Sequence, residues 1–81
     1  MTAKEMFEKL GYEYYKEQGV ITYINKEDDN EKTIEFIDNG LSDILVRINE
    51  KEYYVFCISL EELQAINKQV EELGWEEWQK K

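Results

Sequence analysis

The apolar residues change their spacing twice along the 81-residue chain, and this change limits the fold more than any other feature. Near both ends they recur every three or four residues, as on one side of a helix, whereas from about residue 12 to residue 58 they tend to alternate with polar residues, as in strands. Proline, which interrupts regular structure, is absent. The pattern predicts one α+β domain over residues 1–81, with an antiparallel sheet of four to five short strands flanked by an N-terminal and a C-terminal helix (α-β-β-β-β-β-α).

The first helix is marked by signals at both of its ends. Thr2 and Glu5 have the spacing of a capping box, in which each side chain accepts a hydrogen bond from the other residue's backbone N–H. Gly11 is suited to the left-handed conformation that commonly ends a helix. These signals predict a helix from about residue 3 to residue 10. Its apolar side is formed by Ala3, Met6, Phe7 and Leu10.

The second helix repeats the same signals near the other end of the chain. Ser59 and Glu62 form another capping box, and Gly74 is the expected helix end. The spacing places Glu61 and Glu62 among the residues that face water. The side that faces the core is predicted to consist of Leu63, Ile66, Val70 and Leu73.

Five short segments between the helices are rich in tyrosine, isoleucine and valine and are separated by turn residues. The predicted strands are Tyr12–Lys16, Val20–Asn25, Lys32–Ile37, Ile44–Ile48 and Tyr53–Ile58. A two-residue turn at Asn39-Gly40 would set Phe36 opposite Asp43. A three-residue loop over 39–41 sets Phe36 opposite Ile44 instead, and Ile34 opposite Val46, which keeps the apolar residues together on one face. We therefore predict the three-residue loop, with Gly40 in the left-handed conformation.

The last strand is predicted to pair through a tight turn at Glu50-Lys51. That turn sets Ile48 opposite Tyr53, Val46 opposite Val55 and Ile44 opposite Cys57. The segment Tyr53–Ile58 is apolar on both of its sides, and a strand of this kind is usually covered on both faces. Two arrangements follow. Either the helices cover opposite faces of the sheet, or both cover one face and the other face meets another chain.

The residue types that most often perform catalysis are scarce. Histidine, the commonest general base and metal ligand, is absent, and Cys57 lies between apolar residues with no base beside it. Each of the four glycines is accounted for by a turn or a helix end, so no phosphate-binding loop is present. The acidic run over 26–31 lacks the glycine and the final glutamate of a calcium loop, and we interpret it as a hairpin tip. We expect a non-catalytic protein without a cofactor or a metal ion.

Composition also limits where the protein works. One cysteine excludes an internal disulfide and fits a reducing compartment. No apolar run approaches the roughly 20 residues that span a bilayer. The charged N-terminal segment is unlike a signal peptide. These observations predict a cytoplasmic protein that does not bind membranes.

The formal net charge is −9, from 19 acidic and 10 basic residues. This charge disfavours direct binding to nucleic acid, whose phosphates are held by lysine and arginine. It either serves solubility alone or is directed at a basic partner. From residue 27 to residue 43 there are seven acids against one lysine. The predicted partner-binding acids in this stretch are Glu27, Asp28, Asp29, Glu31, Asp38 and Asp43.

The aromatic residues suggest a second kind of contact. Tyrosine and tryptophan are favoured at protein interfaces, and the shortage of neighbouring basic residues disfavours base stacking. The predicted aromatic contacts to a partner are Tyr54, Phe56, Trp75 and Trp78. The alternative to a host partner is a homodimer or structural adaptor that uses the sheet face of Tyr54 and Phe56.

The segments MTAKEMFEKLGY (1–12), with FEKLGY at its end, and ELQAINKQVEELGW (62–75) resemble the two ends of short uncharacterised proteins encoded by phages and prophages of Gram-positive bacteria. The resemblance covers about a third of the chain and implies no catalytic residues. It implies a bacterial host cell as the setting, where small acidic phage proteins often inhibit restriction or CRISPR nucleases by imitating DNA. The leading hypothesis is therefore a non-catalytic protein whose acids occupy the basic nucleic-acid-binding groove of a host protein.

Overall fold

The computed structural model describes residues 1–27, 30–38, 40–48, 51–52 and 58–75 and confirms the predicted α+β class. Each predicted helix is present, and the four predicted strands before residue 50 are present with ends shifted by one or two residues. The elements are α1 (Ala3–Lys9), β1 (Glu13–Glu17), β2 (Val20–Glu27), β3 (Asn30–Asp38), β4 (Ser42–Ile48), β5 (Lys51–Glu52) and α2 (Leu60–Leu73).

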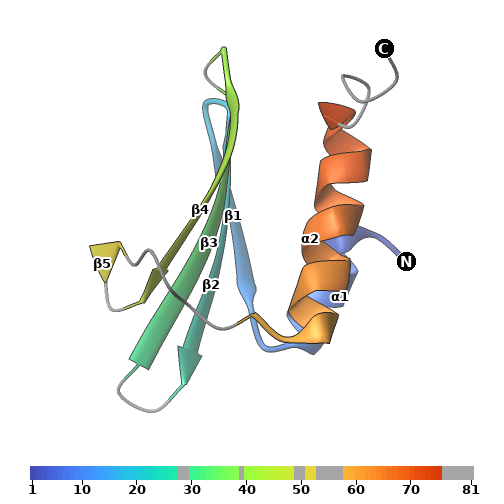
Figure 1. The fold of residues 1–81 in the computed structure, drawn as a ribbon. Helices are drawn as coiled ribbons and strands as arrows, with labels where there is room; N and C mark the ends of the chain where they lie inside the picture. The colour runs from blue at the N-terminus through green and yellow to red at the C-terminus, as the bar shows by residue number, and fades with distance from the viewer. Residues whose placement is uncertain (28–29, 39, 49–50, 53–57, 76–81) are drawn as a thin grey trace.

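The strands form one antiparallel sheet in the order β1-β2-β3-β4-β5. Figure 1 shows α1 and α2 side by side on the same side of this sheet. Of the two arrangements that the sequence allows, the structure therefore has the one in which both helices cover one face. We call the covered side the inner face and the other side the outer face.

The capping signals of α1 work as predicted. Thr2 Oγ1 accepts a hydrogen bond from the backbone N–H of Glu5, and the Glu5 carboxylate accepts one from the N–H of Thr2. These hydrogen bonds with Thr2 lower the pKa of Glu5. Gly11 has a φ of +94°, which brings the N–H of Tyr12 back to the carbonyl oxygen of Phe7 at 3.0 Å. The helix therefore ends where the glycine allows the chain to turn into β1.

The caps of α2 are also confirmed, but its buried side differs from the prediction. The capping box of Ser59 is formed, and Gly74 has a left-handed φ of 76°. Leu63, predicted to face the core, is 45 % exposed, whereas Ala65, Ile66 and Gln69 are buried. The helix is rotated so that polar Gln69 faces inward, because the sheet offers that side chain a hydrogen-bonding partner. The spacing of apolar residues alone cannot predict that a polar side chain faces the core.

The pairing of β3 with β4 is as predicted, whereas the pairing of β4 with β5 is not. Phe36 lies opposite Ile44, and Gly40 has a φ of +97°. Ile48, however, pairs with Lys51 in place of Tyr53. Moving a two-residue turn by one position shifts every pair by two residues and leaves each side chain on its original face. The alternation of apolar residues is therefore equally compatible with both turn positions and could not show which one forms. The predicted partners beyond β5, at 53–57, lie outside the described residues.

Aromatic rings fill the space between the inner face and α1. The Phe7 and Tyr23 rings are stacked, with centroids 3.9 Å apart and planes 20° apart. Phe36 meets Tyr23 edge-on at 6.1 Å, an arrangement that suits the charge distribution of aromatic rings. Phe7, Tyr23, Ile34 and Phe36 are essentially inaccessible to solvent. The other buried apolar residues are Ala3, Tyr12, Ile21, Val46, Ala65 and Ile66.

The buried hydroxyl of Tyr23 joins the sheet to α2. It donates a hydrogen bond of 2.6 Å to Oε1 of Gln69, the only polar residue buried in the described part of the chain. Burial raises the pKa of Tyr23 well above its usual range, and the charges of nearby acidic groups add to this effect. The phenol therefore stays neutral and remains a hydrogen-bond donor.

We expect Tyr23→Phe and Gln69→Met each to lower the free energy of unfolding by about 1–3 kcal/mol, because each leaves one buried polar group without its partner. The double variant removes both polar groups, so its loss in free energy of unfolding should be smaller than the sum of the losses in the two single variants. Urea unfolding of the four proteins measures this coupling. Strictly additive losses would contradict the structural role assigned to this bond.

Candidate functional site

The outer face of the sheet is the surface that the helices leave free. Tyr23, Ile34 and Val46 form one line across the inner face, and strand alternation sends the flanking residues to the opposite side. The outer-face side chains of β1 to β4 are Glu13, Tyr15, Glu17, Val20, Thr22, Ile24, Lys26, Glu31, Thr33, Glu35, Ile37, Asp43, Leu45 and Arg47.

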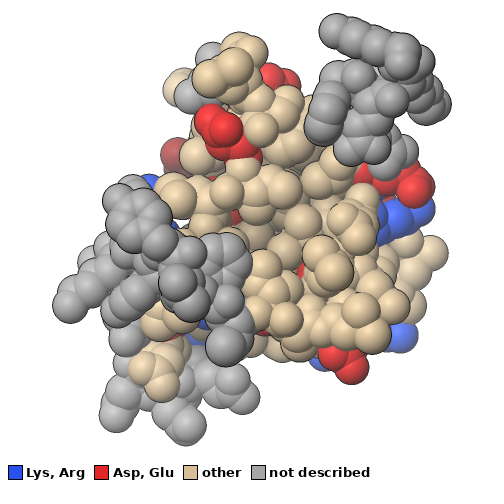
Figure 2. Space-filling model, in the orientation of Figure 1, with Lys and Arg blue, Asp and Glu red and all other residues tan. Residues whose placement is uncertain are grey.

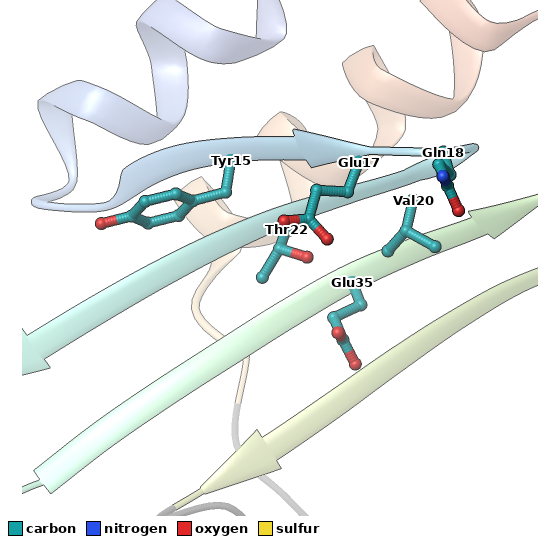
Figure 3. Close-up of a pocket in the computed structure, with 6 residues that line it drawn as sticks. All are labelled: Tyr15, Glu17, Gln18, Val20, Thr22 and Glu35. Carbon is teal, nitrogen blue, oxygen red and sulfur yellow. The ribbon is translucent and has the colours of Figure 1, made fainter.

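A hollow of about 470 Å³ lies on the outer face over β2. It forms because two short side chains, Val20 and Thr22, stand between longer ones on β1 and β3. In the sheet register Tyr15 pairs with Thr22, and Thr22 pairs with Glu35. Figure 3 shows these side chains projecting from three neighbouring strands. We call this site the outer hollow; it is lined by Tyr15, Glu17, Gln18, Val20, Thr22 and Glu35.

Glu35 forms the β3 side of the outer hollow, and its side chain is 17 % exposed. Its Oε1 atom lies 3.3 Å from Nη1 of Arg47, so the two groups form an ion pair. The alignment is poor for a hydrogen bond, and Oε1 is a buried acceptor without a hydrogen-bond donor among the described residues. A buried carboxylate oxygen in this condition retains the capacity to accept a well-aligned donor.

The outer face is acidic in the part that the structure describes. Its side chains include five acids and two bases, which gives a net charge of −3. Lys26 lies 3.9 Å from Glu31, and Arg47 pairs with Glu35. The five acids are Glu13, Glu17, Glu31, Glu35 and Asp43. Figure 2 shows acidic side chains at the end of the sheet that carries the β1–β2 and β3–β4 hairpins.

The acids predicted to bind a partner lie toward opposite ends of the sheet. Glu31 is next to the β2–β3 hairpin, whereas Asp38 and Asp43 flank the β3–β4 hairpin. Asp43 belongs to the outer face, and Asp38 lies near Trp75 at the opposite side. β2 ends at Glu27, and Asp28 and Asp29 lie outside the described residues. The strand β3 separates the two acidic groups by roughly 25 Å.

The predicted aromatic contacts also have different positions. Trp75 packs against the core, with its ring centroid 6.3 Å from that of Phe36. Tyr54, Phe56 and Trp78 lie outside the described residues. The exposed aromatic residue of the outer face is Tyr15, which is 50 % accessible and which the sequence analysis did not select. Tyr15 lies two positions from Glu13 and two from Glu17, and in a strand this spacing places it on the same face as two charged residues, which was the signal that could have identified it.

A second group of ionisable side chains lies between α2 and the inner face. Oε2 of Glu62 accepts a hydrogen bond from the Tyr12 hydroxyl, and Oε1 accepts one from Lys32 Nζ at 2.9 Å and one from the N–H of Ser59 at 2.8 Å. The Glu62 side chain is 14 % exposed, although the sequence placed it on the water-facing side. Burial acts to raise the pKa of Glu62, but the hydrogen bonds from Tyr12, Ser59 and Lys32 outweigh it, and the pKa is lowered. The carboxylate therefore stays ionised and ties α2 to β3 and to Tyr12, which lies between α1 and β1.

We expect Glu62→Gln to lower the free energy of unfolding at neutral pH by about 1–3 kcal/mol, because the charge-assisted bond to Lys32 is lost. A lowered folded-state pKa stabilises the protein above the ordinary glutamate pKa of about 4.3. This stabilisation disappears as the pH falls through the lowered value. The difference in free energy of unfolding between the wild type and Glu62→Gln should therefore become smaller as the pH falls from about 6 to about 3, as measured by urea unfolding. Glu61→Gln, an exposed neighbour, is the control, and equal effects of both changes would contradict the assignment.

The described residues contain no group of three or more acidic or cysteine side chains arranged to hold a metal ion. Neither described helix has the length and apolar character needed to cross a membrane. Comparison with protein-family models, with curated proteins and with solved structures finds no match to this chain.

Proposed function

We propose that this chain is a non-catalytic binding protein that docks the acidic outer face of its sheet onto a basic surface of a host protein. The observation that supports the proposal is the placement of both helices on the inner face, which leaves an outer face with five acids and two bases uncovered by them. The resemblance to phage proteins suggests a bacterial host. In this setting the partner is a defence nuclease whose nucleic-acid-binding groove the acids occupy.

The outer face has the composition of a protein interface. Its centre carries Val20, Ile24, Ile37 and Leu45, all partly buried on the free protein, together with the ion pair of Glu35 and Arg47. Exposed carboxylates of Glu13, Glu17 and Asp43 lie around this centre. Stable interfaces commonly combine an apolar centre with a polar rim, and complementary charge speeds the encounter of the partners. The rim therefore selects a basic partner, while the centre contributes the apolar contact.

The sign of the charge argues against a second copy as the main partner. Two outer faces brought together would each contribute a net charge of −3 from the described side chains. Like charges across an interface are unfavourable, particularly at low salt, where screening is weak. The homodimer alternative predicted from Tyr54 and Phe56 rests on residues outside the described ones.

The proposal is tested by capture from a lysate of a Gram-positive host. The double variant Glu17→Lys/Asp43→Lys reverses two exposed outer-face acids, and Glu8→Lys/Glu61→Lys makes the same change in charge on the helices. We expect the wild type and the helix variant to capture the same nuclease, and the outer-face variant to lose it by at least about tenfold. Duplex DNA or heparin should displace the nuclease, because both compete for its basic groove.

Equal capture by all three proteins would contradict docking through the outer face. A captured protein that duplex DNA does not displace would contradict the imitation of nucleic acid. Sedimentation at micromolar concentration decides the alternative: a stable dimer of the wild-type protein would replace the proposal by self-association.

A further inference from the structure

We propose that the outer hollow binds one arginine side chain of the basic partner protein. The inference rests on the proposed function and specifies which group of the partner the outer face recognises. The hollow lies over the outer face and combines carboxylate side chains with an apolar floor.

The lining of the hollow matches the parts of an arginine side chain. Val20 and the methyl group of Thr22 form a floor on which the aliphatic stem can lie. The carboxylates of Glu17 and Glu35 come from β1 and β3, on either side of that floor. Tyr15 adds an exposed ring, and a guanidinium stacks on such a ring. Figure 3 shows all five side chains around the floor formed by β2.

The carboxylates determine the charge of the ligand. Glu17 is exposed and has no ion pair among the described residues, and Glu35, although paired with Arg47, lines the hollow with a side chain that is 17 % exposed. Anionic groups such as phosphates are repelled by both. A divalent cation would meet two carboxylates where hard cations take six or more oxygen ligands, and no three-acid group is found among the described residues. A cationic side chain is the ligand that remains.

Arginine fits better than lysine for a geometric reason. Its planar guanidinium carries five N–H donors and can donate to carboxylates on two sides while one of its faces contacts a ring. The ammonium group of lysine is a compact and strongly hydrated charge. The exposed carboxylate of Glu17 can accept from one edge of the guanidinium, and the Glu35 side chain, which lines the hollow and is 17 % exposed, can accept from another.

The probe is the peptide acetyl-Gly-Arg-Gly-amide, titrated into the ¹⁵N-labelled full chain and followed by NMR. The same peptide with citrulline replaces the guanidinium by a neutral group of similar shape, and the lysine peptide keeps the charge. We expect saturable shifts centred on the amides of Tyr15, Glu17 and Thr22, with a Kd on the order of 1 mM. Lysine should bind about threefold more weakly, and citrulline should give no saturable shift.

Three variants locate the binding. Glu17→Gln should weaken binding of the arginine peptide by about threefold. Thr22→Leu, whose larger side chain fills the floor of the hollow, should weaken it by about tenfold. Glu8→Gln removes an exposed acid from α1 and should bind as the wild type does. The dispersion of each spectrum shows whether the variant is folded.

Two results would overturn the inference: wild-type affinity in both hollow variants, or shifts spread equally over the helix acids and the outer face. If capture of the host nuclease is lost in Glu17→Lys/Asp43→Lys while the hollow variants bind the peptide normally, the proposed function stands and the arginine site fails. If the peptide binds in the hollow but no nuclease is captured, the proposed function fails alone.

Discussion

The arrangement of the molecule depends on Tyr23, where the sheet and both helices meet. Its ring stacks on Phe7 of α1, and its hydroxyl bonds Gln69 of α2, so one side chain of a central strand fixes both helices. Stacking requires close parallel contact, and the hydrogen bond requires a definite direction. The two together hold the helices to one face of the sheet. That the two helices leave the outer face free, and every functional statement built on this, follows from their attachment to one side.

Several acids of the helices hold structural elements together and do not only add negative charge. Glu72 accepts a hydrogen bond of 2.9 Å from the N–H of Ala3, which ties α2 to the start of α1. Glu5 completes the cap of the same helix, and Glu62 joins α2 to Lys32 of β3. The net charge of the whole chain is therefore a poor measure of what is available to a partner. The acids of the outer face are the better measure, because in the described part of the chain Glu13, Glu17 and Asp43 form no hydrogen bond or ion pair to another element.

The parts of the fold that could be predicted from the sequence are those set by neighbouring residues. The capping boxes at Thr2 and Ser59 and the loop around Gly40 involve residues only a few positions apart. The residue type at each of these positions therefore indicates the local backbone conformation. The side of the sheet taken by each helix depends on contacts between distant residues such as Tyr23 and Gln69, which no spacing rule encodes.

Polar residues that face inward account for most of what the sequence could not show. A binary division into apolar and polar places Glu62 and Gln69 in water, yet each is held by partners from other elements. The outer hollow escaped prediction for a related reason. It is made by the heights of side chains on three adjacent strands, and their register must be known before short Val20 and Thr22 are seen to lie between longer neighbours.

The strand β2 serves both faces of the sheet through its alternation. Its inward residues, Ile21 and Tyr23, belong to the buried core, and its outward residues, Val20 and Thr22, form the floor of the hollow. Because successive side chains point in opposite directions, the outward positions can change size without entering the core. Stability and recognition are thus carried by different residues of one strand. A chain of this size can then vary its binding surface while Tyr23 keeps the helices where they are.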